Sequence, residues 1–198
     1  MKIIPYALSD VGKKRDHNED SYLVRDDVGL FAVADGMGGH QAGERASRMA
    51  LDTLVGELKP PDDSTDRKDV LACLRDATQA AGAAIFDAAQ ADPGLQGMGT
   101  TLTSLWFHRG RAYLAHVGDS RAYLFRDGRI QQLSDDHSWV SEQVRAGMMT
   151  EEEARESKFR HIITRSVGFE REVLVDGAAI PVQAGDCYVI CSDGLSNY

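Results

Sequence analysis

The stretch FAVADGMGGHQAGE (residues 31–44) joins an apolar run to a carboxylate, a cluster of glycines and a helix-like pattern. The apolar run ends at Asp35, and Gly36, Gly38 and Gly39 follow within the next four residues. A carboxylate at a strand end is held by the sheet and projects into a crevice, and glycine lets a ligand or a backbone approach. Glycine-rich turns also bind phosphate or serve as plain tight turns. The rest of the chain has to decide between these functions.

The size and charge of the chain limit the classes of function. With 198 residues, of which 42% are apolar, the chain can bury one substantial core, and a single domain over residues 1–198 is expected. Its 22 basic and 31 acidic residues give a net charge of −9. That balance argues against nucleic acid or a membrane surface as the partner, because both attract clustered Lys and Arg. A phosphorylated substrate requires metal ions that neutralise the site locally.

Cysteine usage and hydropathy indicate a cellular compartment. The three cysteines form no CxxC pair, no apolar run reaches the length of a membrane span, and the N-terminus lacks a signal-peptide pattern. We therefore expect a reduced, cytoplasmic protein.

Hydrophobic periodicity predicts an α+β arrangement rather than alternating βαβ units. Short strands are expected near both ends of the chain and helices in its middle. The expected elements are strands at residues 21–27 and 29–35, helices at 41–58 and 67–91, an antiparallel meander of four strands over 101–136, short polar helices over 138–157, and a strand at 186–193.

Carboxylates adjoin glycine at three distant corners of the chain, namely Asp35-Gly36, Gly118-Asp119 and Asp193-Gly194. One such pair is more often a plain turn. Three of them, two after strongly apolar runs, favour a site for a hard cation, since Mg²⁺ and Mn²⁺ prefer oxygen ligands and retain several waters. No cysteine and histidine cluster with zinc spacing competes with this interpretation.

The stretch GKKRDHNED (residues 12–20) adds a cation beside two acidic residues. Arg15 offers a fork of donors that fits a phosphate. Glu19 and Asp20 are adjacent and point to opposite faces of a straight strand, so at least one of them acts through water or as a support. Taken alone, the stretch is equally typical of a charged loop.

Seven motifs in order, RDHNED, VADGMGGH, GMGTTLT, VGDSRAYL, DDHS, ITRSVG and CSDGL, resemble the bacterial type of the PP2C (PPM) family of metal-dependent protein serine/threonine phosphatases. The resemblance covers residues 15–195. It implies a four-layer α-β-β-α sandwich, in which two antiparallel sheets pack face to face with helices outside each. The active site is then expected in a cleft at one edge, where strand ends bring the acidic residues together.

The resemblance also implies that the site binds two Mn²⁺ or Mg²⁺ ions and, more weakly, a third. Asp35 resembles the carboxylate that bridges two ions, and the carbonyl of Gly36 is a further ligand. Asp193 matches a direct ligand of one ion, and Asp119 matches a ligand of the third. Bound metals lower the pKa of a water, which then attacks phosphorus without a phosphoenzyme.

The acidic pair and the arginine of RDHNED receive roles from the same resemblance. Glu19 and Asp20 match residues that support the metal site, mostly through metal-bound waters. Arg15 matches the residue that binds the substrate phosphate. The implied activity is hydrolysis of phosphoserine and phosphothreonine in proteins, opposing a bacterial Ser/Thr kinase, by a monomer that binds neither nucleic acid nor membrane.

Two departures from the family pattern matter. Some relatives carry a histidine directly after Asp-Gly, where this chain has Met37. His40 either protonates the leaving group or is a helix-end or surface residue. The family pattern also closes with an Asp-Asn pair on a strand that would follow Tyr198, so the domain is expected to lack its C-terminal strand or strands.

Alternative functions were weighed against the phosphatase. The dinucleotide fingerprint GxGxxG fails because Gln41 stands at its third glycine, and a phosphate-binding P-loop lacks its Gly-Lys-Ser/Thr. A phosphatase-like binding or scaffold module that has lost turnover is the remaining alternative. Substrate preference is expected in the polar flap, residues 135–166, because loops at a cleft carry specificity.

Overall fold

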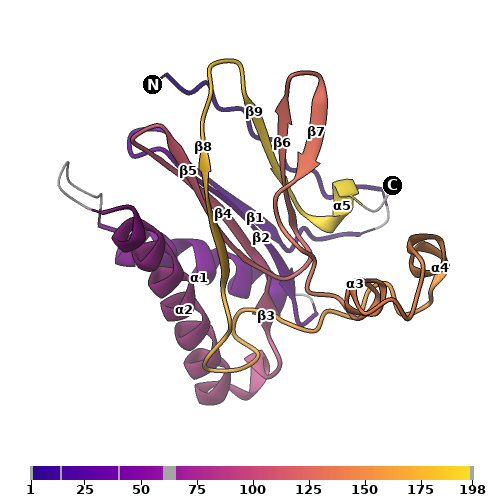
Figure 1. Ribbon diagram of the computed structural model, residues 1–198. Helices are drawn as coiled ribbons and strands as arrows, with labels where there is room; N and C mark the ends of the chain where they lie inside the picture. The colour runs from indigo at the N-terminus through magenta and orange to yellow at the C-terminus, as the bar shows by residue number, and fades with distance from the viewer. Residues whose placement is uncertain (1, 14, 40, 60–65, 197–198) are drawn as a thin grey trace.

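The computed structural model describes residues 2–13, 15–39, 41–59 and 66–196 of the chain (Figure 1). Strands and helices alternate irregularly along it, in the order β1 (Asp20–Arg25), β2 (Leu30–Met37), α1 (Gln41–Glu57), α2 (Arg67–Ala91), a 3₁₀ turn (Pro93–Leu95), β3 (Gly99–Thr100), β4 (Leu102–His108), β5 (Arg111–Val117), β6 (Arg121–Arg126), β7 (Arg129–Gln132), α3 (Trp139–Arg145), α4 (Glu151–Glu156), β8 (Asp176–Pro181), β9 (Cys187–Cys191) and α5 (Asp193–Ser196).

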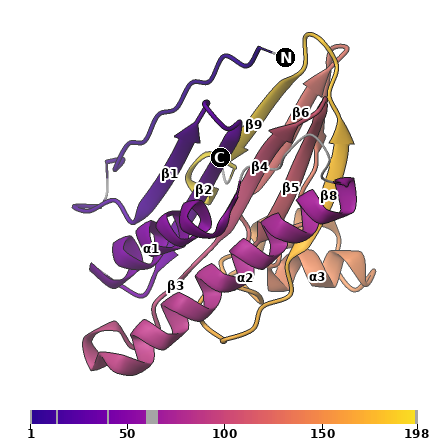
Figure 2. The ribbon, with the colours of Figure 1, turned by 90° about the vertical axis from the view of Figure 1, so that its left-hand side faces the viewer.

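The strands form two antiparallel sheets. The first has the order β1-β2-β4-β5-β8, with β3 paired to β2, and the second has the order β7-β6-β9. Helices α1 and α2 lie together along one face of the first sheet, and α3 and α4 extend to one side of the sandwich (Figure 1 and Figure 2). The expected α+β class with two antiparallel sheets and flanking helices is confirmed.

Side-chain alternation along the central strand β4 explains why the first sheet is covered on both faces. Leu102 and Trp106 belong to the core under α1 and α2. Leu105 and Phe107, which point the other way, pack in a second core between the two sheets. Each face thus buries its own apolar set, and the sheets are held together by the second core.

The expected helices agree with the structure, because their apolar residues recur at helical spacing. Helix α2 begins after the N-cap Asp66, whose carboxylate accepts from the backbone N–H of Lys68, and it ends before Asp92 and Pro93. None of the helices in the described part of the chain has the length and apolar composition that a bilayer crossing demands.

The expected four-stranded meander is wrong, because its strands divide between the two sheets. β4 pairs with β5 and β6 pairs with β7, but β5 and β6 do not pair. The connection turns at Gly118, whose φ of 109° favours glycine, and a Cβ there would lie 2.5 Å from the side chain of Thr101. Gly118 and Asp119 therefore form the crossing point from one sheet to the other rather than a hairpin turn.

One strand boundary and one whole strand also differ from expectation. Strand β2 continues past Asp35 to Met37, because Gly36 and Met37 pair with β3. Strand β8 was not anticipated, although it completes the first sheet beside β5. Its sequence, DGAAIP, has small residues and a proline, which are weak strand formers.

Candidate functional site

The register of β1 on β2 brings the first two carboxylates together. Asp20 pairs directly with Asp35 across the antiparallel ladder, and side chains of such a pair lie on the same face, a few ångströms apart. That face also carries Phe31, which stacks on Phe107 in the region between the sheets. Both carboxylates therefore point toward the second sheet.

The end of β9 brings a second segment to this place. The hydroxyl of Ser192 donates to Oδ2 of Asp20 at 2.7 Å, across 172 positions of sequence. Asp193 follows as the first residue of α5. Acidic residues from two different sheets therefore lie near one another. Asp20 and Asp35 belong to the first sheet, and Asp193 follows β9 of the second.

Hydroxyl groups hold the backbone of Asp35 and the sheet crossing in one network. The backbone N–H of Asp35 donates to Oγ1 of Thr101 at 2.9 Å, and its carbonyl accepts from Oγ1 of Thr100 at 2.9 Å. Thr101 and Ser120 share a hydroxyl hydrogen bond of 2.7 Å. Because Ser120 directly follows Asp119, this network fixes the spacing between Asp119 and Asp35.

Electrostatics show that four carboxylates face one another; we call Asp20, Asp35, Asp119 and Asp193 the carboxylate cluster. Burial, aided by Asp20, Asp193 and Asp119, raises the pKa of Asp35 to about 9. Burial, then Asp193 and Asp136, raises the pKa of Asp119 to about 6. Like charges in a half-buried place disfavour ionisation, so a cation is needed to keep Asp35 charged near neutrality.

Glu19 lies on the opposite face of β1 from Asp20, as the adjacency of the two residues predicts. Its Oε1 lies against Gly43 of α1, where a Cβ would approach it to 2.5 Å. That oxygen is buried and has no hydrogen-bond partner among the described residues. The Glu19 side chain therefore faces the start of α1.

The glycines of the opening stretch have structural reasons as well. A Cβ on Gly36 would collide with the backbone carbonyl of Gly43 and lie 2.6 Å from that of Glu19. Gly38 and Gly39 have φ values of 133° and 77°, which allow the chain to turn from β2 into α1. These glycines permit a close strand-to-helix approach, whether or not a ligand also uses the space.

Arg15 and His40 were also expected to be catalytic residues. Arg15 is exposed in the segment ahead of β1. His40 lies outside the described residues, and its expected role stays a prediction.

The donor set fits hydrated hard cations better than a closed protein cage. Among residues whose placement is described, no three Asp, Glu, His or Cys side chains form a compact metal-binding group. The cluster nevertheless gathers only carboxylates, and burial together with the neighbouring carboxylates raises the pKa of Asp35. Mg²⁺ and Mn²⁺ take few protein carboxylates and keep several waters, which suits this open arrangement.

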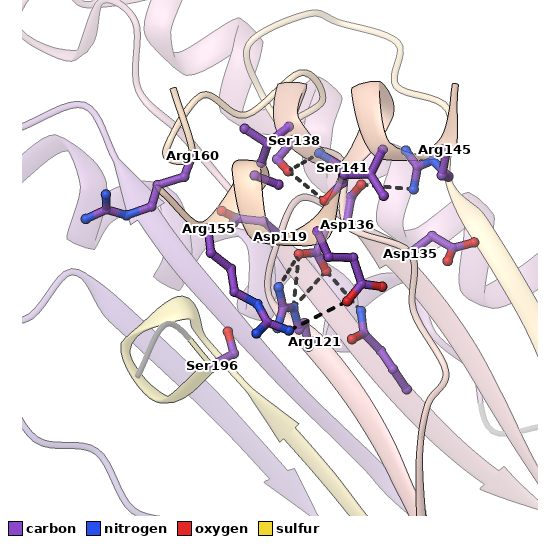
Figure 3. Close-up of a pocket in the computed structure, with 15 residues that line it drawn as sticks. Asp119, Arg121, Asp135, Asp136, Ser138, Ser141, Arg145, Arg155, Arg160 and Ser196 are labelled. Carbon is purple, nitrogen blue, oxygen red and sulfur yellow. Dashed lines mark hydrogen bonds and ion pairs between the residues drawn. The ribbon is translucent and has the colours of Figure 1, made fainter. Parts of the chain in front are cut away.

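A groove adjoins the cluster on the flap side; we call the cavity lined by Asp119, β6 and the flap the flap groove. Its volume is about 1060 Å³. Figure 3 shows Arg145, Arg155 and Arg160 of the flap around it. At its base, Arg121 donates to both carboxylate oxygens of Asp136, with the shortest contact at 2.6 Å.

Sequence reasoning gave no roles to the residues that hold the cluster in place. Thr100, Thr101, Ser120 and Ser192 each contact the backbone or side chain of a cluster residue or its neighbour. Their signal was weak, because a hydroxyl residue beside glycine is common in turns. Only the pairing of distant strands reveals what these hydroxyl groups bind.

Comparison with known proteins places the chain among phosphatases. Residues 12–198 match the family described as Protein phosphatase 2C. The chain is 38% identical over 192 residues to serine/threonine phosphatase stp of Listeria welshimeri serovar 6b, covering 96% of this chain and 76% of that protein. It is 43% identical over 192 residues to serine/threonine protein phosphatase PstP of Mycobacterium tuberculosis, covering 96% of this chain and 36% of that protein.

Solved structures agree with the sequence comparison. The crystal structure of the M. tuberculosis serine/threonine phosphatase PstP/Ppp superposes with a TM-score of 0.87 at 41% identity, covering 96% of this chain and 78% of that one. The catalytic domain of PstP in complex with two manganese ions superposes with a TM-score of 0.82 at 41% identity, covering 96% and 77%.

Proposed function

The chain belongs to the protein phosphatase 2C family of metal-dependent protein serine/threonine phosphatases, and we propose that its carboxylate cluster is the metal centre of that activity. The observation that carries the proposal is the convergence of Asp20, Asp119 and Asp193 on Asp35, whose pKa is raised to about 9 by its burial and by their charges. Perturbed carboxylates at the edge of a cleft mark functional sites.

Within this centre, each residue of the chain has a distinct task. Asp35 holds divalent cations, with the carbonyl of Gly36 beside it, and Asp193 and Asp119 hold them from the second sheet and the crossing. When bound, two such cations, Mn²⁺ or Mg²⁺, supply the Lewis acidity that activates a water for attack on phosphorus. A third cation at Asp119 is compatible with the same donor set.

The residues around the cluster bind and orient. Asp20 is held by Ser192 at 2.7 Å and supports the site through water, and Glu19 supports it from the side of α1. Arg15 binds the phosphate of the substrate with its planar fork of donors. His40 supplies a proton to the leaving group.

The flap groove receives the polypeptide on one side of the phosphorylated residue. It adjoins Asp119, and its lining includes Arg145, Arg155 and Arg160 of the flap, of which Arg155 pairs with Glu151. We propose that Arg145 and Arg160 favour acidic residues next to the phosphorylation site. We further propose a cytoplasmic monomer that opposes a Ser/Thr protein kinase, which suits the charge of −9 and the absence of any CxxC pair in the sequence.

Hydrolysis of a phosphothreonine peptide tests this function, with p-nitrophenyl phosphate as a second substrate. Activity should require Mn²⁺ or Mg²⁺, disappear with EDTA and return when metal is restored. Peptides with acidic flanks should have a lower KM than matched peptides with basic flanks. Phosphate release that persists in EDTA would show that the activity does not depend on metal. Metal binding without any turnover would indicate a binding module instead of an enzyme.

A further inference from the structure

His137 is a buried histidine at the point where the chain enters the flap, and only 1% of its surface is exposed. Its backbone N–H donates to the carbonyl of Gly118 at 2.8 Å. Its Nδ1 accepts from the backbone N–H of Gly118 at 3.0 Å. One residue thus satisfies both backbone groups of the glycine that precedes Asp119.

The far side of the same ring faces β8. Nε2 lies 3.1 Å from Oδ2 of Asp176 and 3.0 Å from Nη1 of Arg165. That Nη1 donates its hydrogens to the other oxygen of Asp176 at 2.8 Å and to the carbonyl of Leu174 at 3.2 Å. A backbone amide can only donate, so Nδ1 must be unprotonated, and the ring proton must be on Nε2. The ring therefore accepts from Gly118 and donates to Asp176 at the same time.

His137 also joins the two ends of the flap. Its carbonyl accepts from the backbone N–H of Thr164 at 2.9 Å, and the next residue, Arg165, contacts Asp176. On the inner side, His137 stacks on His116, with ring centroids 4.8 Å apart. Both flap ends, the sheet crossing and the edge strand therefore meet at this one side chain.

We propose that His137 is a positioning residue, which holds the Gly118–Asp119 crossing in its metal-binding conformation and ties that crossing to both ends of the flap and to β8. The reason is geometric. Gly118 has a φ of 109°, a backbone conformation that residues other than glycine rarely adopt. Its backbone N–H and carbonyl are buried, so water cannot replace a lost hydrogen-bond partner. The part that concerns catalysis rests on the proposed role of Asp119.

Two substitutions separate the two functions of the ring. In His137→Asn, the amide oxygen occupies the place of Nδ1 and still accepts from Gly118, whereas the contact with Asp176 is lost. In His137→Gln, the amide nitrogen reaches the place of Nε2 and still donates to Asp176, but Gly118 loses its acceptor. The matched control is His108→Gln, at the far end of β4.

Amide hydrogen exchange of the metal-free protein gives the first readout. Loss of the acceptor should speed exchange of the Gly118 amide about tenfold or more in His137→Gln, with much less change in His137→Asn and none in His108→Gln. Equal exchange of this amide in the Gln and Asn variants would overturn the proposal.

The Mn²⁺ dependence of peptide hydrolysis gives the second readout. His137→Gln should need a several-fold higher Mn²⁺ concentration for half-maximal activity, while kcat at saturating Mn²⁺ recovers and His137→Asn stays near the parent. A lower kcat at saturating metal in both variants, with unchanged Mn²⁺ dependence, would show a merely structural role. If the parent protein shows no turnover, the proposed function fails, and the exchange measurement still decides whether His137 holds Gly118.

A third variant covers the case in which neither His137 variant folds. Asp176→Ala alters the ring from its more exposed side, because 44% of the Asp176 side chain is accessible. It should raise Gly118 exchange by a smaller factor than His137→Gln. Unchanged exchange in Asp176→Ala, with both His137 variants unfolded, would also overturn the proposal.

Discussion

The carboxylate cluster and the paired aspartates of the second sheet place the same side chain in opposite surroundings. Burial and three neighbouring carboxylates raise the pKa of Asp35 to about 9. The ion pair with Arg126 lowers the pKa of Asp186 to about 2. Asp136 is likewise paired, with two nitrogen atoms of Arg121 on its oxygens.

The difference teaches how to separate function from structure among buried acids. Asp136 and Asp186 have their charges compensated by Arg121 and Arg126, so neither needs a ligand from outside to be charged in the fold. The members of the cluster repel one another, and the divalent cations proposed above would remove that cost.

The largest effect is expected for Asp35→Asn. Metal catalysis supplies several kcal/mol of transition-state stabilisation, so kcat/KM should fall on the order of a thousandfold or more. Mn²⁺ binding by calorimetry should weaken, and the metal-free variant should melt at a higher temperature because the free-energy cost of keeping the buried Asp35 protonated near neutrality is gone. The control Asp186→Asn should lose stability and retain Mn²⁺-dependent turnover. An Asp35→Asn variant that binds Mn²⁺ as tightly as the parent would refute the assignment.

The second effect concerns stability at the paired aspartate. Arg121→Met leaves the Asp136 carboxylate, 8% exposed, without its cation, and the free energy of unfolding should fall by about 3 kcal/mol. The double variant Arg121→Met, Asp136→Leu should recover most of that loss. Urea denaturation of the metal-free proteins measures both. If the single and double variants were equally stable, the loss in Arg121→Met would not come from an uncompensated charge on Asp136.

The third effect distinguishes a cation that binds substrate from a cation that compensates a buried acid. Arg15→Ala should lower kcat/KM for a phosphopeptide by about one to two decades through a higher KM, because one charge-assisted contact is lost. Metal affinity and thermal stability should stay near the parent values, unlike those of Arg121→Met. The control Arg25→Ala removes only a surface pair with Asp27. Unchanged KM in Arg15→Ala would end its phosphate-binding role.

The smallest effect concerns how the free energy of unfolding of the metal-free protein depends on pH, because His116 and Asp35 contribute slopes of opposite sign. Burial, aided by His137, lowers the pKa of His116 from 6.5 to about 4. The unfolded chain binds this proton first as pH falls, so stability contributed by His116 declines below pH 6.5, by up to about 1.4 kcal/mol per pH unit. Asp35 acts oppositely, because its raised pKa makes the folded state bind the proton first.

Urea denaturation between pH 8 and 4.5 separates the two slopes. The parent should show the sum of these contributions. Asp35→Asn should lose stability more steeply on acidification, because the opposing contribution of Asp35 is removed and only the smaller one of Asp119, whose pKa is raised to about 6, still opposes that of His116. Identical pH profiles in the two proteins would argue that Asp35 is not perturbed as the cluster requires.

Local sequence patterns correctly predicted the helices, because a helix forms its backbone hydrogen bonds within one segment. Helices at residues 41–58 and 67–91 match α1 and α2 because 3.6-residue spacing and caps are local signals. The meander failed because a turn at Gly118 looks the same whether the next strand pairs with β5 or leaves for another sheet. Strand β8 was missed because DGAAIP carries almost no strand propensity of its own.

The candidate site was predicted in its chemistry but not in its construction. Asp35, Asp119 and Asp193 were expected from their glycine neighbours, and Glu19 and Asp20 were expected to point apart. The hydrogen bonds of Thr101 and Ser192 to cluster segments were not foreseen, because each joins residues more than 60 positions apart. Nothing in the local sequence of His137 shows that its ring reaches Gly118.

The sequence alone thus determined the helices, the acidic character and the kinds of ligand atom at the site, since these depend on residue type and short-range spacing. The tertiary structure decided which carboxylates face one another, which are paired with arginine, and which backbone groups His137 holds. The physical reason is that strand register and burial are set by contacts between distant segments. A carboxyl group acquires its pKa from those contacts, so two aspartates in one chain can differ as widely as Asp35 and Asp186.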